Sequence, residues 1–185
     1  MDPDRTPKNL ETPASARIQS DGSFDMAGPS GPRVLRLAED ASDWTLKGIW
    51  LNGQDVTDIP LRFGTANQSI DGLDVVLTDR VSEVTGHAVD ARERGMADAT
   101  VVVFPVDRTL WAQASRFVAS VRTATDGAFG LRNLPPGYYY AAAVTQLTSG
   151  EWRDPDLLDA LVPSATPLTI IEGDAVTATL RAVTR

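Results

Sequence analysis

The stretch Thr125-Asp126-Gly127-Ala128-Phe129 decides the fold, because the same pattern of residue types stands at Ser20-Asp21-Gly22-Ser23-Phe24. In both copies the Asp-Gly pair predicts a tight turn, since aspartate accepts hydrogen bonds from nearby backbone amides and glycine tolerates positive φ. The phenylalanine that follows predicts a strand that begins by entering a core. A repeated corner of this kind indicates a strand-built chain with two related modules.

Each corner is followed by a turn rich in glycine and proline, at residues 28–32 in the first copy and 134–137 in the second. Proline holds the preceding residue extended and glycine permits the reversal, so the next strand starts in a fixed register. Alternating runs follow at residues 33–37 and 138–144. Each copy closes on an acidic residue, a glycine and a last apolar run, which favours duplication of the whole unit.

Turn residues recur about every ten residues from Ser20 onward, a spacing typical of sandwiches and barrels. We therefore predict an all-β protein with a disordered leader at 1–19, a first module at 20–80 and a second module at 81–185. The leader is rich in proline and polar residues and has few apolar ones. The first module has far fewer residues ahead of its Asp-Gly turn than the second, so we expect it to be shorter or incomplete.

Within the second module, the pattern predicts seven strands and one short helix inserted between them. The helix is expected at 154–161, where apolar residues at helical spacing follow an acidic start that contains a proline. A second short helix is expected at 110–112, and Asn52-Gly53 predicts a tight type I′ hairpin in the first module. The strands are expected at about 83–90, 100–106, 117–123, 128–131, 138–146, 167–171 and 175–183.

Charge and composition exclude several classes of partner. The formal charge of -8 and the pI near 4.6 disfavour nucleic acid and anionic lipid, which bind clustered Lys and Arg. No stretch reaches the roughly 18 apolar residues needed to cross a bilayer, and we read no signal peptide in this chain. Cysteine is absent, which removes disulfides, thiolate nucleophiles and Cys-ligated metals.

Residues able to carry catalysis are sparse. The only histidine, His87, lies inside an alternating run, so we read it as a structural or exposed strand residue rather than a zinc ligand. Ser115 and Ser164 lack the strand-turn-helix context of a nucleophile elbow. We therefore predict that the chain is not an enzyme, with no catalytic residues, no metal and no cofactor.

The carboxylates have a structural and a metal-binding interpretation. Asp154, Asp156 and Asp159 gather at the expected helix start, where acidic groups cap free amides and complement the helix dipole. Calcium needs several carboxylates plus carbonyls in a closing loop, and that spacing is absent both here and at Asp55 and Asp58. Capping is the favoured interpretation.

The second module resembles a carboxypeptidase regulatory-like domain. The resemblance is carried by residues 84–90 and 99–105, by Asp126-Gly127-Ala128-Phe129 and by residues 134–139. Gly86 and Gly95 match the family's opening, although Gly95-Met96-Ala97 stands where the family often has Gly-Pro or Gly-Lys-Pro. A narrower resemblance, covering nearly everything after Gln19, is to large uncharacterised bacterial proteins that carry arrays of such domains.

The resemblance implies two tandem Greek-key β-sandwich modules, prealbumin-like or immunoglobulin-like. It also implies a structural or interaction module of a larger exported bacterial protein, acting as a spacer or docking surface. Its partners would be other domains of the same polypeptide or a separate protein. A periplasmic, extracellular or cell-surface location follows if the chain is part of a longer precursor.

The aromatic residues support an alternative, a carbohydrate-binding module, because sugars stack on exposed Trp and Tyr rings. Alternation places Tyr138 and Tyr140 on one face of a strand and Tyr139 on the other. Core or inter-module packing is the favoured interpretation of these rings. For Arg116 an ion pair with an acidic loop such as Glu151 or Asp154 is the structural alternative. The candidate ligand or interface residues are Trp111, Trp152, Tyr139 and Arg116.

Overall fold

The computed structural model describes residues 14–27, 29–38, 43–64, 69–112, 115–148 and 150–184. These fall into two compact units, one drawn from Met1–Arg36 and Ile49–Asp74 and the other from Leu37–Gly48 and Val75–Arg185. Each unit takes residues from two separate stretches, a division that differs from one boundary near residue 80. Most of the expected leader, as far as Pro13, lies outside the described residues.

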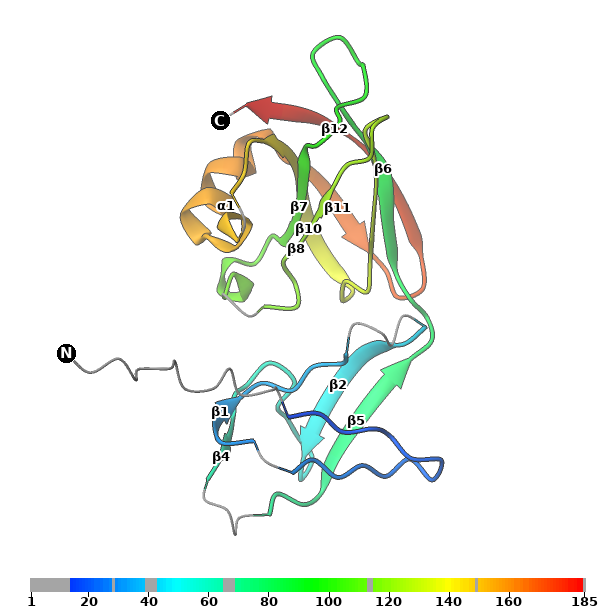
Figure 1. Cartoon of the computed structure of the whole chain (residues 1–185), viewed down its shortest axis with the longest axis vertical. Coiled ribbons are helices and arrows are strands. Elements are labelled where there is room, and N and C mark those ends of the chain that lie inside the picture. The colour runs from blue at the N-terminus through cyan, green and yellow to red at the C-terminus, as the bar shows by residue number, and fades with distance from the viewer. Residues whose placement is uncertain are drawn as a thin grey trace, which may run out of the picture. The chain divides into compact units, whose positions relative to one another are not determined.

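Two small sheets lie in the first half of the chain (Figure 1). Strand β1 (Gly31–Arg33) pairs antiparallel with β4 (Leu61–Phe63). Strands β2 (Thr45–Leu51), β3 (Gln54–Asp55) and β5 (Leu73–Thr78) form a second sheet in the order β3-β2-β5. The strand expected at 33–37 forms two residues earlier, at Gly31–Arg33, and residues 34–37 are not in a strand.

The predicted hairpin at Asn52-Gly53 is confirmed. Both residues have positive φ, 52° and 81°, as a type I′ turn requires. The flanking pairs are Trp50 with Asp55 and Leu51 with Gln54. The local preference of the Asn-Gly pair therefore sets the register of β2 and β3.

The two Asp-Gly corners have the same local structure. Asp21 accepts from the amide of Ser23 at 2.9 Å, as Asp126 does from the amide of Ala128 at 2.9 Å. In each corner two backbone bonds close the turn, from Gln19 to Ser23 and Gly22 to Gln19 in the first, and from Ala124 to Ala128 and Gly127 to Ala124 in the second. The two glycines have φ values of 82° and 84°. The identical turn chemistry therefore produced identical turns.

The surroundings of the two corners differ. Phe129 lies in β9 (Ala128–Arg132) and is buried in the core of its unit. Phe24 lies outside any strand, is half-buried, and lines a hollow of about 760 Å³ beside Leu61 and Phe63. The expectation that Phe24 begins a strand is wrong, because in the described residues its backbone joins no ladder, although two residues of β4 line the same hollow.

The large unit is a β-sandwich, shown in the upper half of Figure 1. Its strands are hydrogen-bonded in the order β8-β7-β10-β12-β6-β9, with β11 also paired to β10. The strands not yet bounded are β6 (Glu83–Val89), β7 (Thr100–Pro105), β8 (Ala119–Arg122), β10 (Gly137–Thr145), β11 (Thr166–Ile170) and β12 (Ala175–Thr184). All seven strands predicted for this region are confirmed to within about two residues at each end.

Strand β12 joins the two layers of the sandwich. Residues 175–181 pair in parallel with β6, and residues 182–184 pair in parallel with β10. Antiparallel pairs connect β10 to β7 and β11, β7 to β8, and β6 to β9. One layer is therefore β8-β7-β10-β11, the other is β9-β6-β12, and the last strand belongs to both.

The core between the layers collects alternate residues from both. Val101 and Val103 of β7 and Tyr139, Ala141 and Ala143 of β10 point into it, and all are buried. The opposing layer contributes the following residues: Val84, Ala88, Phe129, Ala178 and Leu180. These residues have the period of two that a pleated strand imposes.

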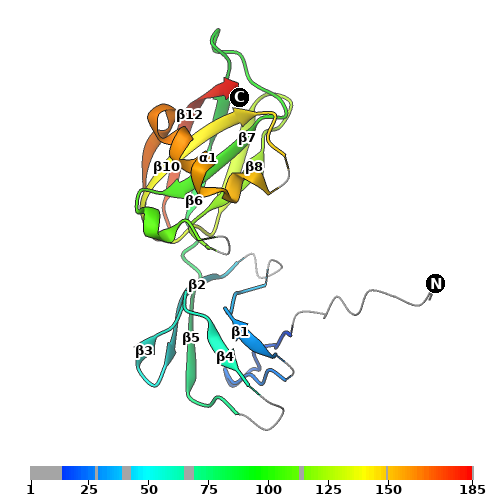
Figure 2. The same cartoon turned by 90° about the vertical axis from the view of Figure 1, so that its left-hand side faces the viewer.

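A second core lies on the outer face of β7 and β10. Helix α1 (Pro155–Leu161) covers this face with Leu157, Leu158 and Leu161 (Figure 2). The strand residues beneath it are Val102, Phe104, Ala142 and Val144. Every residue of β7 is consequently buried, which explains the apolar run that follows Thr100 in this strand.

Helix α1 begins where the sequence predicted it. The second short helix, expected at 110–112, forms at a different position. Asp154 is the N-cap of α1, where its carboxylate accepts from the amide of Asp156 at 3.0 Å. Pro155 occupies the first helical turn, where its missing donor has no cost. The single 3₁₀ turn near the expected 110–112 helix is Arg108–Leu110, because Asp107 caps it two residues earlier than expected.

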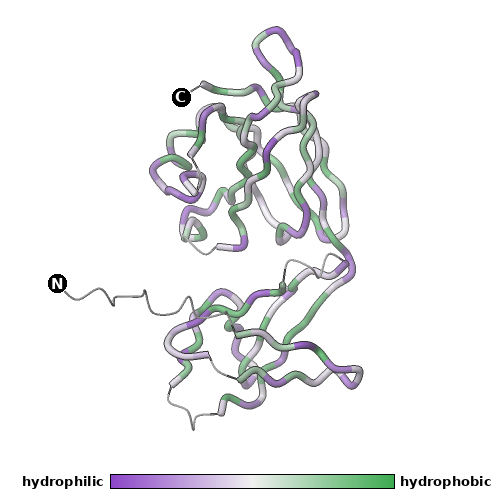
Figure 3. Tube along the Cα trace, in the orientation of Figure 1, coloured by the Kyte–Doolittle hydropathy of each residue, from purple (hydrophilic) through white to green (hydrophobic). Residues whose placement is uncertain are grey.

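Gly86 and Gly95 occupy positions that a side chain would not fit. A Cβ at Gly86 would lie 1.7 Å from the carbonyl oxygen of Ala178 in β12, and its φ is 156°. A Cβ at Gly95 would lie 1.9 Å from the carbonyl oxygen of Asp126, so the loop from β6 to β7 packs on the Asp-Gly corner. The rest of this loop, within residues 90–99, contains both charged and apolar residues (Figure 3).

We predict that Gly86→Ala lowers the free energy of unfolding by at least about 2 kcal/mol, because the parallel β6-β12 pair must separate to admit the methyl group. Gly130→Ala is the matched control in the paired strand β9, where a Cβ meets nothing within 4 Å. It should change stability by less than about 1 kcal/mol. Urea denaturation of the three proteins measures this, and equal losses at both glycines would contradict the close approach.

Candidate functional site

The three consecutive tyrosines of β10 have three different environments. Tyr139 is 1% exposed in the core between the layers, and Tyr140 is half-buried against the second core. Tyr138 is 73% exposed. Alternation correctly separated Tyr139 from its neighbours, but Tyr138 and Tyr140 differ because α1 and its flanking turns cover only part of the outer face.

Tyr139, a predicted ligand or interface residue, is a structural residue of the core. Its hydroxyl donates to the carbonyl of Pro135 at 2.7 Å, which ties β10 to the Pro-Pro-Gly turn that precedes it. Burial raises the pKa of Tyr139 well above its ordinary value, with a smaller opposing effect from the positive charge of Arg116. The phenol is therefore neutral and available only to the fold.

Trp111 is likewise a buried packing residue. It is 6% exposed, and its indole Nε1 donates to the carbonyl of Pro105 at 2.8 Å. Its ring meets Phe104 edge to face, with centroids 5.7 Å apart. The guanidinium of Arg108 lies 5.5 Å from the ring centroid. No face of this ring is open to a sugar.

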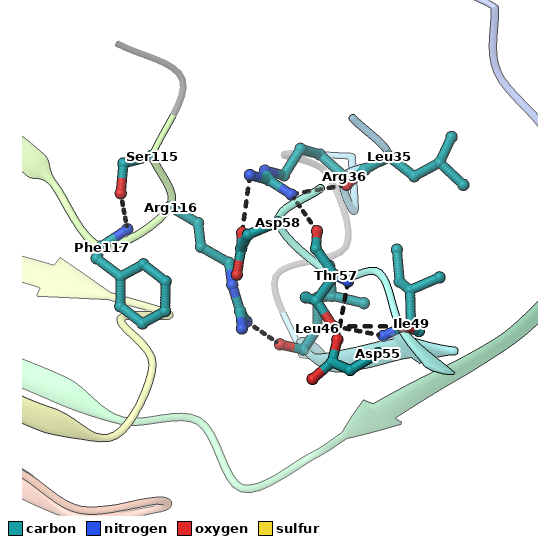
Figure 4. A network of polar contacts seen from close by, with 10 residues as sticks. All are labelled: Leu35, Arg36, Leu46, Ile49, Asp55, Thr57, Asp58, Ser115, Arg116 and Phe117. Carbon is teal, nitrogen blue, oxygen red and sulfur yellow. Dashed lines mark hydrogen bonds and ion pairs between the residues drawn. The ribbon is translucent and has the colours of Figure 1, made fainter. Parts of the chain in front are cut away.

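Arg116 contacts the backbone and an aromatic ring. Its Nη1 donates to the carbonyl of Leu46 at 2.9 Å, and its guanidinium lies 5.0 Å from the ring centroid of Phe117 (Figure 4). The two acidic residues considered as its partners have local roles. Glu151 accepts from the amide and hydroxyl of Thr148, and Asp154 caps α1.

Trp152 lies at the edge of a polar hollow. The hollow measures about 320 Å³ and is lined by Thr100, Ser120, Val121, Arg122, Leu147, Thr148 and Trp152. The indole is half-buried against the second core, and the guanidinium of Arg153 lies 4.2 Å from its centroid. Arg153 therefore covers one face of the ring.

A second hollow, of about 300 Å³, lies beside Tyr138 at the other end of β10. Its lining is mainly apolar and comprises Pro105, Val106, Asp107, Leu110, Phe117, Pro136, Gly137, Tyr138 and Tyr139. The amide of Val106 donates to the carbonyl of Tyr138 at 2.9 Å, which holds β7 and β10 together at this end. Tyr138 was not among the predicted site residues. The signal that would have selected it is its position directly after the Gly/Pro turn, beyond the reach of the helix.

Asp55 and Asp58, considered as calcium ligands, serve a turn and an ion pair. Asp55 accepts from the amide and hydroxyl of Thr57, and the Thr57 hydroxyl in turn accepts from the amide of Ile49 at 2.8 Å (Figure 4). Asp58 pairs with Arg36 at 3.0 Å, and Arg36 also donates to the carbonyl of Thr57. These contacts satisfy local backbone groups.

The remaining carboxylates near the site also cap backbone or pair with arginine. Asp159 forms an ion pair with Arg108, which links α1 to the turn that carries Trp111. Hydrogen bonds from the hydroxyl and amide of Thr109 lower the pKa of Asp107. Bonds from the backbone and side chain of Arg94 likewise lower the pKa of Asp90. Within the described residues, no three His, Asp or Glu side chains form a metal-binding group.

The residues considered for catalysis lie on different parts of the unit. His87 is exposed on β6, where its neighbours across the sheet are Thr179 and Ala128. The Ser115 hydroxyl accepts from the amide of Phe117, and the Ser164 hydroxyl donates to the carbonyl of Leu161 at the end of α1. Both serines therefore bind nearby backbone. No helix in the described part of the chain has the length and apolar character to span a bilayer.

No family model matches the chain, and no curated protein matches it. The resemblance to the carboxypeptidase regulatory-like family therefore stays a prediction from sequence. Among solved structures, the Bacillus anthracis TIE protein is 16% identical with a TM-score of 0.37, over 66% of this chain and 20% of that one. A streptococcal ancillary pilin is 17% identical with a TM-score of 0.38, over 66% and 39%.

A third solved structure is the dioxygenase domain of a dioxygenase and carbohydrate-binding fusion from Streptomyces sp. SirexAA-E. It is 16% identical with a TM-score of 0.33, over 55% of this chain and 78% of that one. This chain thus spans well under half the length of the first protein and of the pilin. Likenesses of this size carry no argument about activity, ligand or partner.

We predict that Tyr139→Phe lowers the free energy of unfolding by about 1 kcal/mol or more near neutral pH, because the buried Pro135 carbonyl loses its donor. The difference between the two proteins should shrink from about pH 9 to about pH 11. The folded state holds Tyr139 neutral above its ordinary pKa, so the unfolded state loses the proton first and wild-type stability falls as pH rises. Urea denaturation across this pH range measures the difference, which would stay constant if Tyr139 ionised freely in the fold.

Proposed function

We propose that the chain is a non-catalytic structural and interaction module of a larger exported bacterial protein, acting as a spacer or docking surface. Its partners are other domains of the same polypeptide or a separate protein, in the periplasm, outside the cell or at its surface. The exported setting rests on the sequence resemblance to arrays of domains in large bacterial proteins. The architecture supports the proposal in its own right, since a rigid sandwich presents several stable faces.

The observation that carries this proposal is the use of the polar groups of the candidate residues. Trp111 donates to the carbonyl of Pro105, Tyr139 to that of Pro135, and Arg116 to that of Leu46. Each bond satisfies a backbone acceptor of the chain itself. Side chains that tie loops to strands stabilise a scaffold, whereas a catalytic group needs a free polar atom aimed at a substrate.

We predict that Trp111→Ala lowers the free energy of unfolding by about 3 to 5 kcal/mol, because it removes a buried indole and its hydrogen bond. Trp44→Ala is the matched control, since Trp44 is 48% exposed. This second substitution should change the free energy of unfolding by less than about 0.5 kcal/mol. Thermal and urea denaturation measure both effects. A Trp111→Ala protein with unchanged stability would contradict the scaffold role.

A carbohydrate-binding module is the second candidate, favoured by the hollow beside Trp152. Hydroxyls of Thr100, Ser120 and Thr148 line it together with the guanidinium of Arg122. Such groups hydrogen-bond sugar hydroxyls when an aromatic edge orients the ring. Arg153 covers one face of the indole and the ring is half-buried, which leaves little of it for stacking and places the scaffold function first.

A glycan array separates the two candidates. We expect no saturable binding of the labelled chain to any neutral glycan, because Arg153 covers one face of the half-buried Trp152 ring. If binding is seen, Trp152→Ala tests whether this hollow is responsible, with Trp44→Ala as the control. Reproducible binding that is lost with Trp152→Ala and kept with Trp44→Ala would replace the scaffold function with the carbohydrate-binding one.

A further inference from the structure

Three aromatic rings of the large unit are each in contact with an arginine side chain of the same chain. Arg108 lies over Trp111, Arg116 over Phe117 and Arg153 over Trp152, at 5.5, 5.0 and 4.2 Å from the ring centroids. Each contact is a cation–π interaction, which is strongest where the ring is shielded from water. This unit therefore repeatedly places a guanidinium against an aromatic face.

Tyr138 is an exposed ring of this unit that lacks such a contact. It is 73% exposed, the highest value among the large hydrophobic side chains described. Within the described residues, neither a guanidinium nor a second aromatic ring lies against it. Its ring borders the apolar hollow of about 300 Å³ at the end of β7 and β10.

Asp107 is the charged residue among those that line this hollow. Its Oδ1 accepts from the amide of Thr109 at 2.9 Å and from the Thr109 hydroxyl at 2.7 Å. These bonds lower the pKa of Asp107, so the carboxylate is charged at neutral pH. Both bonds use the same oxygen. Oδ2 accepts no hydrogen bond from the described part of the chain.

We propose that the Tyr138 hollow binds an arginine side chain presented by a partner protein. The aliphatic stem lies against Val106 and Pro136, and the guanidinium lies over the Tyr138 ring and donates to the Asp107 carboxylate. This inference rests on the proposed interaction function and names the partner's chemistry. The net charge of -8 adds a general attraction for a cationic partner.

The lining selects arginine over two other ligands. A planar guanidinium stacks on an aromatic face and donates from a fork, whereas the lysine ammonium is a strongly hydrated point charge. A sugar needs several hydrogen-bonding groups around it, and this hollow is mainly apolar with a single carboxylate. A long side chain with an apolar stem and a cationic end matches both features.

The test is an NMR titration of the isotope-labelled full-length chain with acetyl-arginine methylamide. The neutral isostere acetyl-citrulline methylamide is titrated as the matched probe. The amides of Val106, Asp107 and Tyr138 should shift saturably with arginine, with a dissociation constant on the order of millimolar. The citrulline probe should bind at least about fivefold more weakly, because it lacks the charge that both contacts require.

Variants assign the two contacts. Tyr138→Ala should weaken arginine binding by about threefold or more, and Tyr138→Phe should retain it because the ring face is kept. Asp107→Asn keeps an oxygen for the Thr109 cap but removes the charge, and should weaken binding by about fivefold. Asp98→Asn makes the same change in net charge at an exposed carboxylate on another loop, and should leave binding unchanged.

Four outcomes would overturn the assignment. The first is no saturable shift at these three residues with arginine. The second is an equal response to cellohexaose, which would give the hollow to the carbohydrate function. The third is a shift with rising protein concentration and no probe, which would make the occupant a second copy of the chain. The fourth is an arginine response confined to other residues, which would show that the Tyr138 hollow is not the binding site. This fourth outcome would leave the proposed interaction function in place, because that function is tested separately by the stability of the Trp111→Ala protein.

Discussion

Burial of β7 and β10 on both faces is the constraint on which the rest of the structure depends. Val101 and Val103 face the other layer of the sandwich, while Val102 and Phe104 face helix α1. A strand apolar on both sides is insoluble unless both sides are covered. The helix inserted between β10 and β11 is therefore part of the core of the sandwich.

This constraint also determines where the surface remains open. Helix α1 covers the middle of the outer face, so Tyr140 is half-buried while Tyr138, two residues earlier on the same face, is exposed. The polar hollow at Trp152 and the apolar hollow at Tyr138 both border β7 or its flanking residues, Thr100 at one end and Pro105 at the other. The first hollow is polar because threonine, serine and arginine side chains line it, and the second is apolar because mainly proline, leucine, valine and aromatic residues line it.

The polar groups of three candidate side chains act on the chain's own backbone. The indole of Trp111 and the guanidinium of Arg116 donate to carbonyls of strand residues, Pro105 in β7 and Leu46 in β2, and the phenol of Tyr139 donates to the carbonyl of Pro135 in a turn. Each of these bonds connects a loop to a strand. A module of this construction suits a chain whose role is to hold or present other surfaces.

The sequence by itself determined the elements that depend on neighbouring residues. The Asp-Gly corners, the Asn-Gly hairpin, the cap of α1 and the strands of the large unit follow from turn chemistry and alternation, which act over a few residues. The glycines at 86 and 95 were also visible as a pattern. Only the structure supplied their reason, a backbone approach across strands far apart in the chain.

Only the tertiary structure decided which aromatic side chains are buried and which are exposed. Two corners with the same hydrogen bonds place Phe129 in a core and Phe24 outside any strand, because burial depends on partners that local sequence does not specify. Trp111 and Tyr139 were predicted as candidate ligand residues and are structural, while Tyr138 was left out and is exposed. The parallel pairing of β12 with both layers has no sequence signature either, since β6 is separated from β12 by most of the unit and a helix and another strand lie between β10 and β12.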